Sequence, residues 1–316
     1  MRNDDSPPRP EATAASAGPD HRPWFTRRST LVIAAAALAP TALAGWVLTQ
    51  VLTGAGPDGR DAKPAAAPKP AAAATATATP APTTAPTTAP AKGPLSGRTV
   101  VIDPGHNTGN FDHTDEIDQK VDIGTNRKEC DTTGTTTNSG YMEAEFTLDV
   151  SQRLRTALEA TGAKVVLTHE ADRPWGPCIN ERARIGNEAK ADAVVSVHAD
   201  GVSSGSRGYH IILPAKVKGG AADTSAIVEP SRRLGERIAS NFARTTGSSP
   251  ANYLGGGTGL VVRDDLGGLN LSTQPKVFIE CGNMRDAKDA AQLTSPDWRQ
   301  KAAQGIADGI VGFLGG

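Results

Sequence analysis

The stretch RTVVIDPGH, residues 98–106, decides the fold of this chain. Its apolar run Val100-Val101-Ile102 predicts a short buried strand, and Asp103-Pro104-Gly105 predicts the turn that ends it. Five further runs of this kind predict strands at residues 164–168, 193–197, 209–213, 259–262 and 276–279. Apolar residues at helical spacing predict helices at residues 146–158, 179–190, 229–246 and 296–313.

The order of these elements predicts the fold class. Strands alternate with helices, and several strands are wholly apolar, which is typical of strands covered on both faces. We therefore expect an α/β fold: a single domain with a largely parallel mixed sheet covered by helices on both faces. Residues 107–140 are rich in Gly, Thr, Asn and Asp without a sustained period, and they predict a long loop.

Composition excludes two classes of function. The 316 residues carry 33 Lys and Arg against 34 Asp and Glu, a net charge of -1, so nothing indicates a nucleic-acid partner. The three cysteines lack CxxC spacing, which excludes a structural zinc site built from cysteine.

The N-terminal part of the chain differs in composition from the rest. It predicts a cytoplasmic n-region with a twin-arginine-like motif (1–30), a signal-peptide h-region or transmembrane anchor (31–53) and an Ala/Pro/Thr-rich disordered linker (54–94). Whether the apolar segment is cleaved or kept as an anchor, the folded domain at residues 95–316 is expected to be extracytoplasmic. Contact with the membrane is then limited to the N-terminal segment.

Three predicted strands end in residues that can bind a metal or move a proton. His106 follows the first strand and its turn, His198 follows Val197, and Glu280 follows Ile279. Because ligand sites in open α/β sheets form beyond the carboxyl ends of strands, we expect the three side chains to share one crevice if their strands are neighbours.

A fourth candidate lies at the start of the first long helix. Glu143 is on the helical face of Val150 and Leu154, where a carboxylate needs a partner. Alternatively, Glu143 is an N-terminal carboxylate favoured by the helix dipole, and Glu145 competes for the same role. Two histidines and a glutamate around an open position form the ligand set of a catalytic zinc hydrolase, with Glu280 as general base.

Four motifs in this order resemble a known family: VVIDPGH (100–106), the glutamate-led helix ending in GAKVVLT (162–168), VSVHAD (195–200) and VFIECGNM (277–284). The chain is similar over residues 97–316 to the zinc-dependent N-acetylmuramoyl-L-alanine amidases of the amidase-3 type, and most to actinobacterial members. These enzymes use zinc-activated water to cleave the amide between N-acetylmuramic acid and the L-alanine of the peptidoglycan stem peptide.

The resemblance implies a role for each site residue. His106, Glu143 and His198 take the ligand positions for one Zn²⁺ per domain, and Glu280 is the catalytic glutamate. Glu143 rather than Glu145 lies at the family's distance from the helix-ending Gly162. The partner is then peptidoglycan, and the expected state is a monomer.

Further expectations also come from the resemblance. In related members a disulfide holds the long loop, which here implies the pair Cys130 and Cys178, with Cys281 as a free thiol behind a buried strand. Arg263 and Asn270 lie near the predicted crevice and are candidate substrate contacts, although Arg263 could equally form a structural ion pair. Only residues 215–229 separate the fourth strand from the next helix, so we expect no autoinhibitory helix and an open site.

Two alternatives keep the fold and change the function. One is a catalytically inactive cell-wall-binding module, which would be expected to have lost a ligand or Glu280. The other is a zinc peptidase acting within the stem peptide.

Overall fold

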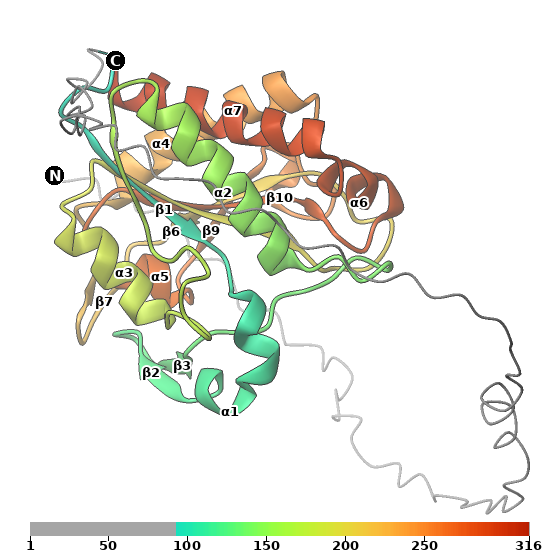
Figure 1. The fold of residues 1–316 in the computed structure, drawn as a ribbon. Coiled ribbons are helices and arrows are strands. Elements are labelled where there is room, and N and C mark those ends of the chain that lie inside the picture. Colours follow the sequence, from blue (N-terminus) through green and yellow to red (C-terminus); the bar gives the residue numbers. More distant parts are fainter. Residues whose placement is uncertain (1–92, 316) are drawn as a thin grey trace, which may run out of the picture. The chain divides into compact units, whose positions relative to one another are not determined.

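Six strands form one sheet in the order β4-β1-β5-β10-β6-β9 (Figure 1). This computed structural model describes residues 93–315, so the predicted n-region, apolar segment and nearly all of the linker lie outside the described residues. The strands are β1 (Thr99–Pro104), β4 (Lys164–Leu167), β5 (Ala193–Asp200), β6 (His210–Pro214), β9 (Leu260–Arg263) and β10 (Lys276–Asn283). No helix within residues 93–315 is long and apolar enough to cross a membrane.

The sheet is mixed but mainly parallel. β1 pairs in parallel with β4 and β5, and β10 pairs in parallel with β5. β6 runs antiparallel to β10, and β9 follows the direction of β6. The carboxyl ends of β1, β5 and β10 therefore meet at one edge of the sheet, as the prediction required.

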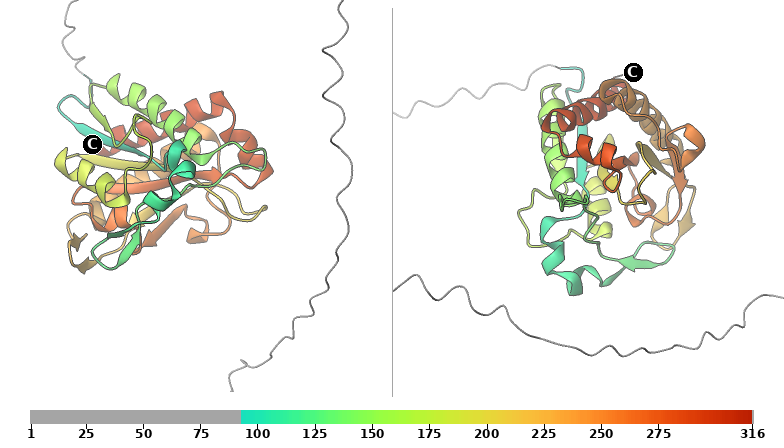
Figure 2. Two further views of the ribbon diagram at one scale, coloured as in Figure 1. Left: turned by 60° about the horizontal axis from the view of Figure 1, so that its bottom comes forward. Right: turned by 90° about the vertical axis from the view of Figure 1, so that its right-hand side faces the viewer.

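Helices cover both faces of the sheet, which confirms the predicted class (Figures 1 and 2). α2 (Glu143–Glu159), α4 (Val228–Thr246) and α7 (Pro296–Leu314) lie on one face, where the main apolar core includes Val100 and Ile102. α3 (Ile179–Glu188) and α5 (Gly267–Asn270) lie on the other, where Val101 and Val194 form a smaller apolar cluster. The first face thus carries most of the apolar burial.

Helix α2 follows its sequence pattern closely. Phe146, Val150, Leu154 and Leu158 are fully buried on the face that packs against the sheet. The chain leaves the helix through Gly162, whose positive φ of 86° favours glycine. The other end of the helix, which begins at Glu143, lies at the edge of the sheet where β1, β5 and β10 end.

Residues 107–140 are not the loop that the sequence predicted. They hold a 3-10 helix, η1 (Thr108–Asp112), a short helix, α1 (Thr114–Ile117), and a hairpin of β2 (Lys120–Asp122) and β3 (Arg127–Glu129). These elements span three to five residues each, too few to give a readable period. A disulfide between Cys130 and Cys178 ties this segment to the start of α3, and it is the pair implied by the resemblance.

The remaining short elements lie between the main strands and helices. They are β7 (Lys218–Gly219), β8 (Ala222–Asp223), η2 (Gly255–Gly257) and α6 (Ala287–Leu293). The segment between β6 and α4 forms the β7–β8 hairpin, and the structure places no helix there. Cys281, in β10, is buried and free, as expected.

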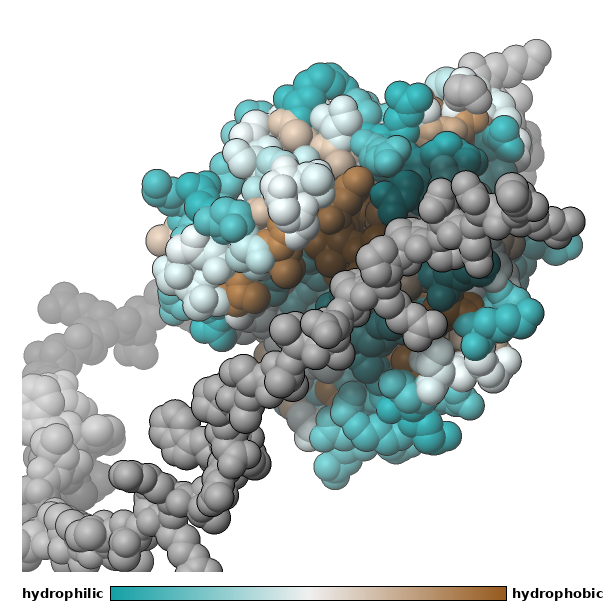
Figure 3. All heavy atoms as spheres, turned by 180° about the vertical axis from the view of Figure 1, so that it is seen from behind, coloured by the Kyte–Doolittle hydropathy of each residue, from teal (hydrophilic) through white to brown (hydrophobic). Residues whose placement is uncertain are grey.

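The surface of this part of the chain is mostly hydrophilic. Among residues 93–315 the exposed large hydrophobic side chains are those of Phe111, Leu254 and Val262. Seen from behind, hydrophobic residues gather in a hollowed strip between hydrophilic rims (Figure 3). A hollowed apolar strip of this kind is typical of a binding face.

Candidate active site

His106, Glu143 and His198 come together at the carboxyl edge of the sheet. Their nitrogen and oxygen ligand atoms all lie within 4.8 Å of one another. Oε1 of Glu143 lies 3.2 Å from Nε2 of His106 and 3.0 Å from Nδ1 of His198. The three residues come from the end of β1, the start of α2 and β5, so the parallel strands and the helix jointly build the cluster.

Two glycines make this close approach possible. A Cβ atom on Gly105 would lie 2.3 Å from the ring of His198. A Cβ atom on Gly134 would lie 2.8 Å from the ring of His106 and 2.9 Å from Oε2 of Glu143. Any larger residue at either position would push the cluster apart.

The loop after the disulfide orients His106. Nδ1 of His106 lies 3.0 Å from the carbonyl oxygen of Thr132 and 3.5 Å from Oδ1 of Asp131. A proton on Nδ1 can donate to that carbonyl, and Nε2, on the side of Glu143, would then be the nitrogen available to a metal ion. Asp131 and Thr132 directly follow Cys130, so the disulfide lies next to the groups that hold this ring.

Backbone amides hold the carboxylate of Glu143 in place. Its Oε2 accepts from the amide of Thr135 at 2.9 Å, and its Oε1 accepts from the amide of Ala199 at 3.2 Å. Burial alone would raise the pKa of Glu143, but His106 and His198 outweigh it and hold the pKa well below its usual range. Glu143 therefore stays ionised, as a metal ligand must.

Glu145 takes a different role. Its carboxylate accepts from the amide of Met142 at 3.2 Å, as a capping residue of α2 does, and its side chain is exposed. The geometry therefore joins Glu143, and not Glu145, to the two histidines.

The donor set fits a metal ion. Two imidazole nitrogens and one carboxylate oxygen converge on one point, and imidazole and carboxylate are ligands of divalent transition metals. The cluster lines an open pocket of about 290 Å³ together with Asp200, Arg263 and Glu280. A metal held there would keep a position open toward the pocket.

Glu280 stands at the same pocket. Its position in β10 is directly opposite His198 in the parallel pairing of β10 with β5. Burial, and then the charges of Glu143 and Asp200, raise the pKa of Glu280 well above its usual range. A raised pKa makes a carboxyl group a stronger proton acceptor than an ordinary glutamate, which suits a general base that afterwards returns the proton as an acid.

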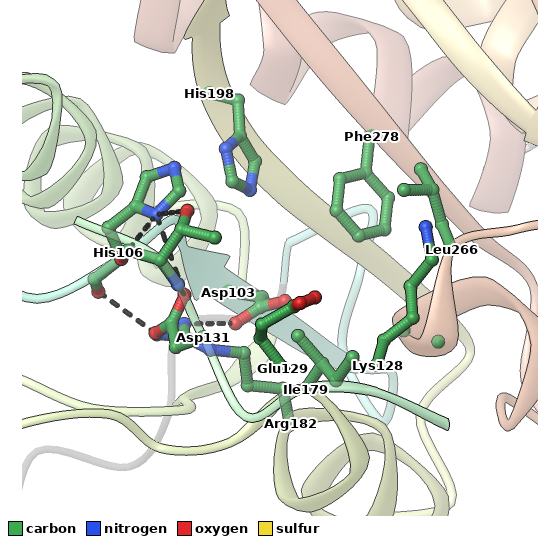
Figure 4. Close-up of a pocket in the computed structure, with 13 residues that line it drawn as sticks. Asp103, His106, Lys128, Glu129, Asp131, Ile179, Arg182, His198, Leu266 and Phe278 are labelled. Carbon is green, nitrogen blue, oxygen red and sulfur yellow. Dashed lines mark hydrogen bonds and ion pairs between the residues drawn. The ribbon is translucent and has the colours of Figure 1, made fainter. Parts of the chain in front are cut away.

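A second cavity, of about 220 Å³, adjoins the cluster (Figure 4). His106 and His198 stand on one side of it, and Phe278, Leu266 and Lys128 stand across from them. Both cavities share the two histidines and Phe278. The two histidines of the cluster therefore line both cavities, and Glu143 lines only the larger one.

A network of buried ion pairs connects the end of β1 to the loop that orients His106. Asp103 accepts from Arg182 at 2.8 Å, from Lys276 at 3.1 Å and from the hydroxyl of Ser196 at 2.5 Å. Arg182 also donates to Asp131, which contacts His106. Arg182 therefore has a structural role, since it links the end of β1 to the loop that orients His106.

The two expected substrate contacts differ in outcome. Arg263 lines the pocket with its side chain 42% exposed, and it also pairs with Asp265 at 2.7 Å. Asn270 is fully buried, and its amide donates to the carbonyl oxygen of Asp264 at 2.7 Å. This burial does not favour a substrate contact for Asn270, whose side chain instead bonds the β9–α5 connection inside the protein.

Sequence reasoning missed several residues around the site. Asp131 and Thr132 orient His106, and Lys276 completes the network under it. A lysine at the head of a wholly apolar strand was the one signal available, because such a position is normally apolar. Nothing in the sequence pattern singled out Asp131 or Thr132.

Comparisons with known proteins identify the family of the chain. The family model described as N-acetylmuramoyl-L-alanine amidase, Amidase_3, matches residues 100–311. The chain is 39% identical over 221 residues to N-acetylmuramoyl-L-alanine amidase Rv3717 of Mycobacterium tuberculosis, covering 70% of this chain and 88% of that protein.

Solved structures give the same result. The amidase Ami1 from Mycobacterium smegmatis superposes with a TM-score of 0.64 and 39% identity, over 70% of this chain and 98% of that one. Ami1 from Mycobacterium abscessus gives 0.64 and 40%, over 70% and 100%. The expected resemblance to actinobacterial members is confirmed, and the chain belongs to the N-acetylmuramoyl-L-alanine amidase family of the amidase-3 type.

Proposed function

We propose that the protein hydrolyses the amide between N-acetylmuramic acid and the L-alanine of the peptidoglycan stem peptide, with one Zn²⁺ held by His106, Glu143 and His198. The convergence of these three ligands beside Glu280, in a chain of this family, carries the proposal. When bound there, zinc supplies Lewis-acid polarisation of a carbonyl oxygen and lowers the pKa of a water molecule.

Each residue of the site then has its own role in the reaction. Glu280 as a carboxylate takes a proton from the attacking water and returns it to the alanine nitrogen as the C–N bond breaks. Arg263, at the pocket wall, offers a cation to the carboxylates of the stem peptide. Gly105 and Gly134 keep the ligands close enough to act together.

The alternatives are not favoured. An inactive wall-binding module would be expected to have lost a ligand or Glu280, and all four residues are present and gathered at one pocket. A peptidase acting within the stem peptide lacks support from the relatives, which are named as N-acetylmuramoyl-L-alanine amidases.

The proposed place of action is outside the cytoplasm. Peptidoglycan lies there, and the disulfide between Cys130 and Cys178 suits an oxidising compartment. The n-region (1–30) and the apolar segment (31–53) would direct the domain across the membrane, and the apolar segment would be either cleaved as a signal peptide or kept as an anchor. The linker (54–94) would let the domain reach the wall, where we propose that it acts as a monomer.

Digestion of purified peptidoglycan by the purified protein tests the proposal. We expect new free amino termini of L-alanine, lost on addition of a chelator and restored by Zn²⁺, because the ligand set needs its ion. The new chain ends are identified by labelling and mass spectrometry. New ends within the stem peptide would favour the peptidase, and wall binding without cleavage would favour the inactive module.

Two neighbouring glutamates provide a test of the metal site. Glu143→Ala removes the carboxylate between the two histidines, so Zn²⁺ affinity should fall by at least about a hundredfold. Glu145→Ala removes only a capping contact and should bind Zn²⁺ like the parent. Calorimetric titration measures both, and loss of affinity in the Glu145 variant alone would reverse the assignment.

A further inference from the structure

The antiparallel strand β6 places a histidine beside Glu280. Because β6 runs against β10, its first residue, His210, lies directly opposite Glu280 in the register of the two strands. Directly opposed side chains lie on the same face of a sheet, with Cβ atoms about 4.5–5.5 Å apart. Ile212 and Phe278, the next pair on that face, both line the pocket that Glu280 lines.

Each side chain of this pair has a buried polar atom without a partner. Within residues 93–315, neither Nδ1 of His210 nor Oε2 of Glu280 has a hydrogen-bond partner. His210 is only 3% exposed, so water does not readily satisfy its ring. Two unpaired polar atoms on cross-strand neighbours complement each other, since an imidazole nitrogen can bond either form of a carboxyl group.

The surroundings keep His210 in place and neutral. The ring of Tyr253 meets it edge-on at 6.0 Å, and the Tyr253 hydroxyl donates to Asp200 at 2.9 Å. Burial, only partly opposed by Asp200, lowers the pKa of His210. A neutral imidazole can donate to a carboxylate and accept from a carboxylic acid, so it can serve Glu280 in both of its protonation states.

We propose that His210 is a positioning residue for Glu280: its Nδ1 bonds Oε2 of Glu280 in the substrate complex and turns the other carboxylate oxygen toward water and the leaving nitrogen. The two atoms are not bonded in this structure, and catalytic hydrogen bonds commonly tighten only when substrate is bound. The proposal goes with the proposed function, because it assigns the residue that holds the general base of the same reaction.

Kinetics of the full-length protein on a soluble muropeptide test the assignment. His210→Leu should lower kcat by at least about tenfold with little change in KM, because only the orientation of the general base is lost. His210→Asn, whose amide nitrogen lies near the position of Nδ1, should keep kcat within about threefold of the parent. If the leucine variant does not fold, His210→Gln replaces it, because its amide reaches the position of Nε2 instead.

A control next to this strand separates positioning from stability. Tyr209 immediately precedes β6 and belongs to the main apolar core, and its hydroxyl donates to the carbonyl oxygen of Ala239 at 3.0 Å. Tyr209→Phe should lower Tm and leave kcat within about twofold of the parent. Unchanged kcat in His210→Leu would overturn the proposal. Equal kcat in His210→Asn and in His210→Leu, or in His210→Gln where it replaces the leucine variant, would also overturn it. Cleavage by the parent protein tests the proposed function separately.

Discussion

Glu280→Gln is expected to lower kcat for peptidoglycan cleavage by about 10²–10⁴-fold, which corresponds to about 3–5 kcal/mol of barrier. Glutamine has the shape of glutamate but cannot take up the proton of the attacking water. The proposed Zn²⁺ ligands are unchanged, so metal content should equal that of the parent. Steady-state kinetics with metal analysis of the same samples measures both quantities.

A nearby carboxylate serves as the control for this prediction. Glu145→Gln also replaces a glutamate by its amide near the site, but Glu145 lies outside the ligand cluster. It should keep nearly all activity. If Glu280→Gln retained more than about a tenth of the parent kcat, Glu280 would not be the general base.

Asp103→Asn is expected to lower the free energy of unfolding by about 3–5 kcal/mol. The change removes the anion that Lys276 and Arg182 share inside the protein. Arg182 keeps Asp131, but no other anion forms an ion pair with Lys276 in the described part of the chain. Urea unfolding of the two proteins, both treated with chelator, measures the difference.

The pH dependence of this difference has a definite sign. Burial by itself would raise the pKa of Asp103, but Lys276 and Arg182 outweigh it and hold the pKa far below its usual range. A carboxyl group with a depressed folded-state pKa stabilises the protein above its unfolded pKa, and that stabilisation is lost as the pH falls. The gap between parent and variant should therefore be complete at neutral pH and shrink below about pH 4.

Two further variants separate this network from ordinary ion pairs. Adding Lys276→Met to Asp103→Asn should recover much of the lost stability, because the stranded ammonium group is removed. Arg184→Ala breaks an exposed pair with Glu188 and should leave the unfolding midpoint almost unchanged. Equal effects of Asp103→Asn and Arg184→Ala would contradict a structural role for the network.

Much of the site was predictable because parallel strands align their ends. His106, His198 and Glu280 could be grouped from three apolar runs alone, since the carboxyl ends of such strands meet at one edge. Glu143 followed from its place on the buried face of a helix, although choosing it over Glu145 needed the family register. Periodicity also located the long helices, whose apolar faces repeat over several turns.

What the sequence did not predict depends on strand direction and on short elements. His210 begins a strand that runs against its neighbour, so a strand start meets a strand end, and the pattern of apolar residues does not reveal direction. Asn270 lay close to the crevice in the chain but points into the interior. The elements between residues 107 and 140 are held by contacts from distant segments, which no local pattern records.

The disulfide between Cys130 and Cys178 links the geometry of the site to the redox state of the compartment that contains the chain. The residues that orient His106 come directly after Cys130, so a chain with reduced thiols has a less constrained ligand. Thiols stay reduced in the cytoplasm and oxidise outside it. If the chain is exported as proposed, the loop that orients His106 would gain its disulfide only outside the cytoplasm, in the compartment that contains peptidoglycan.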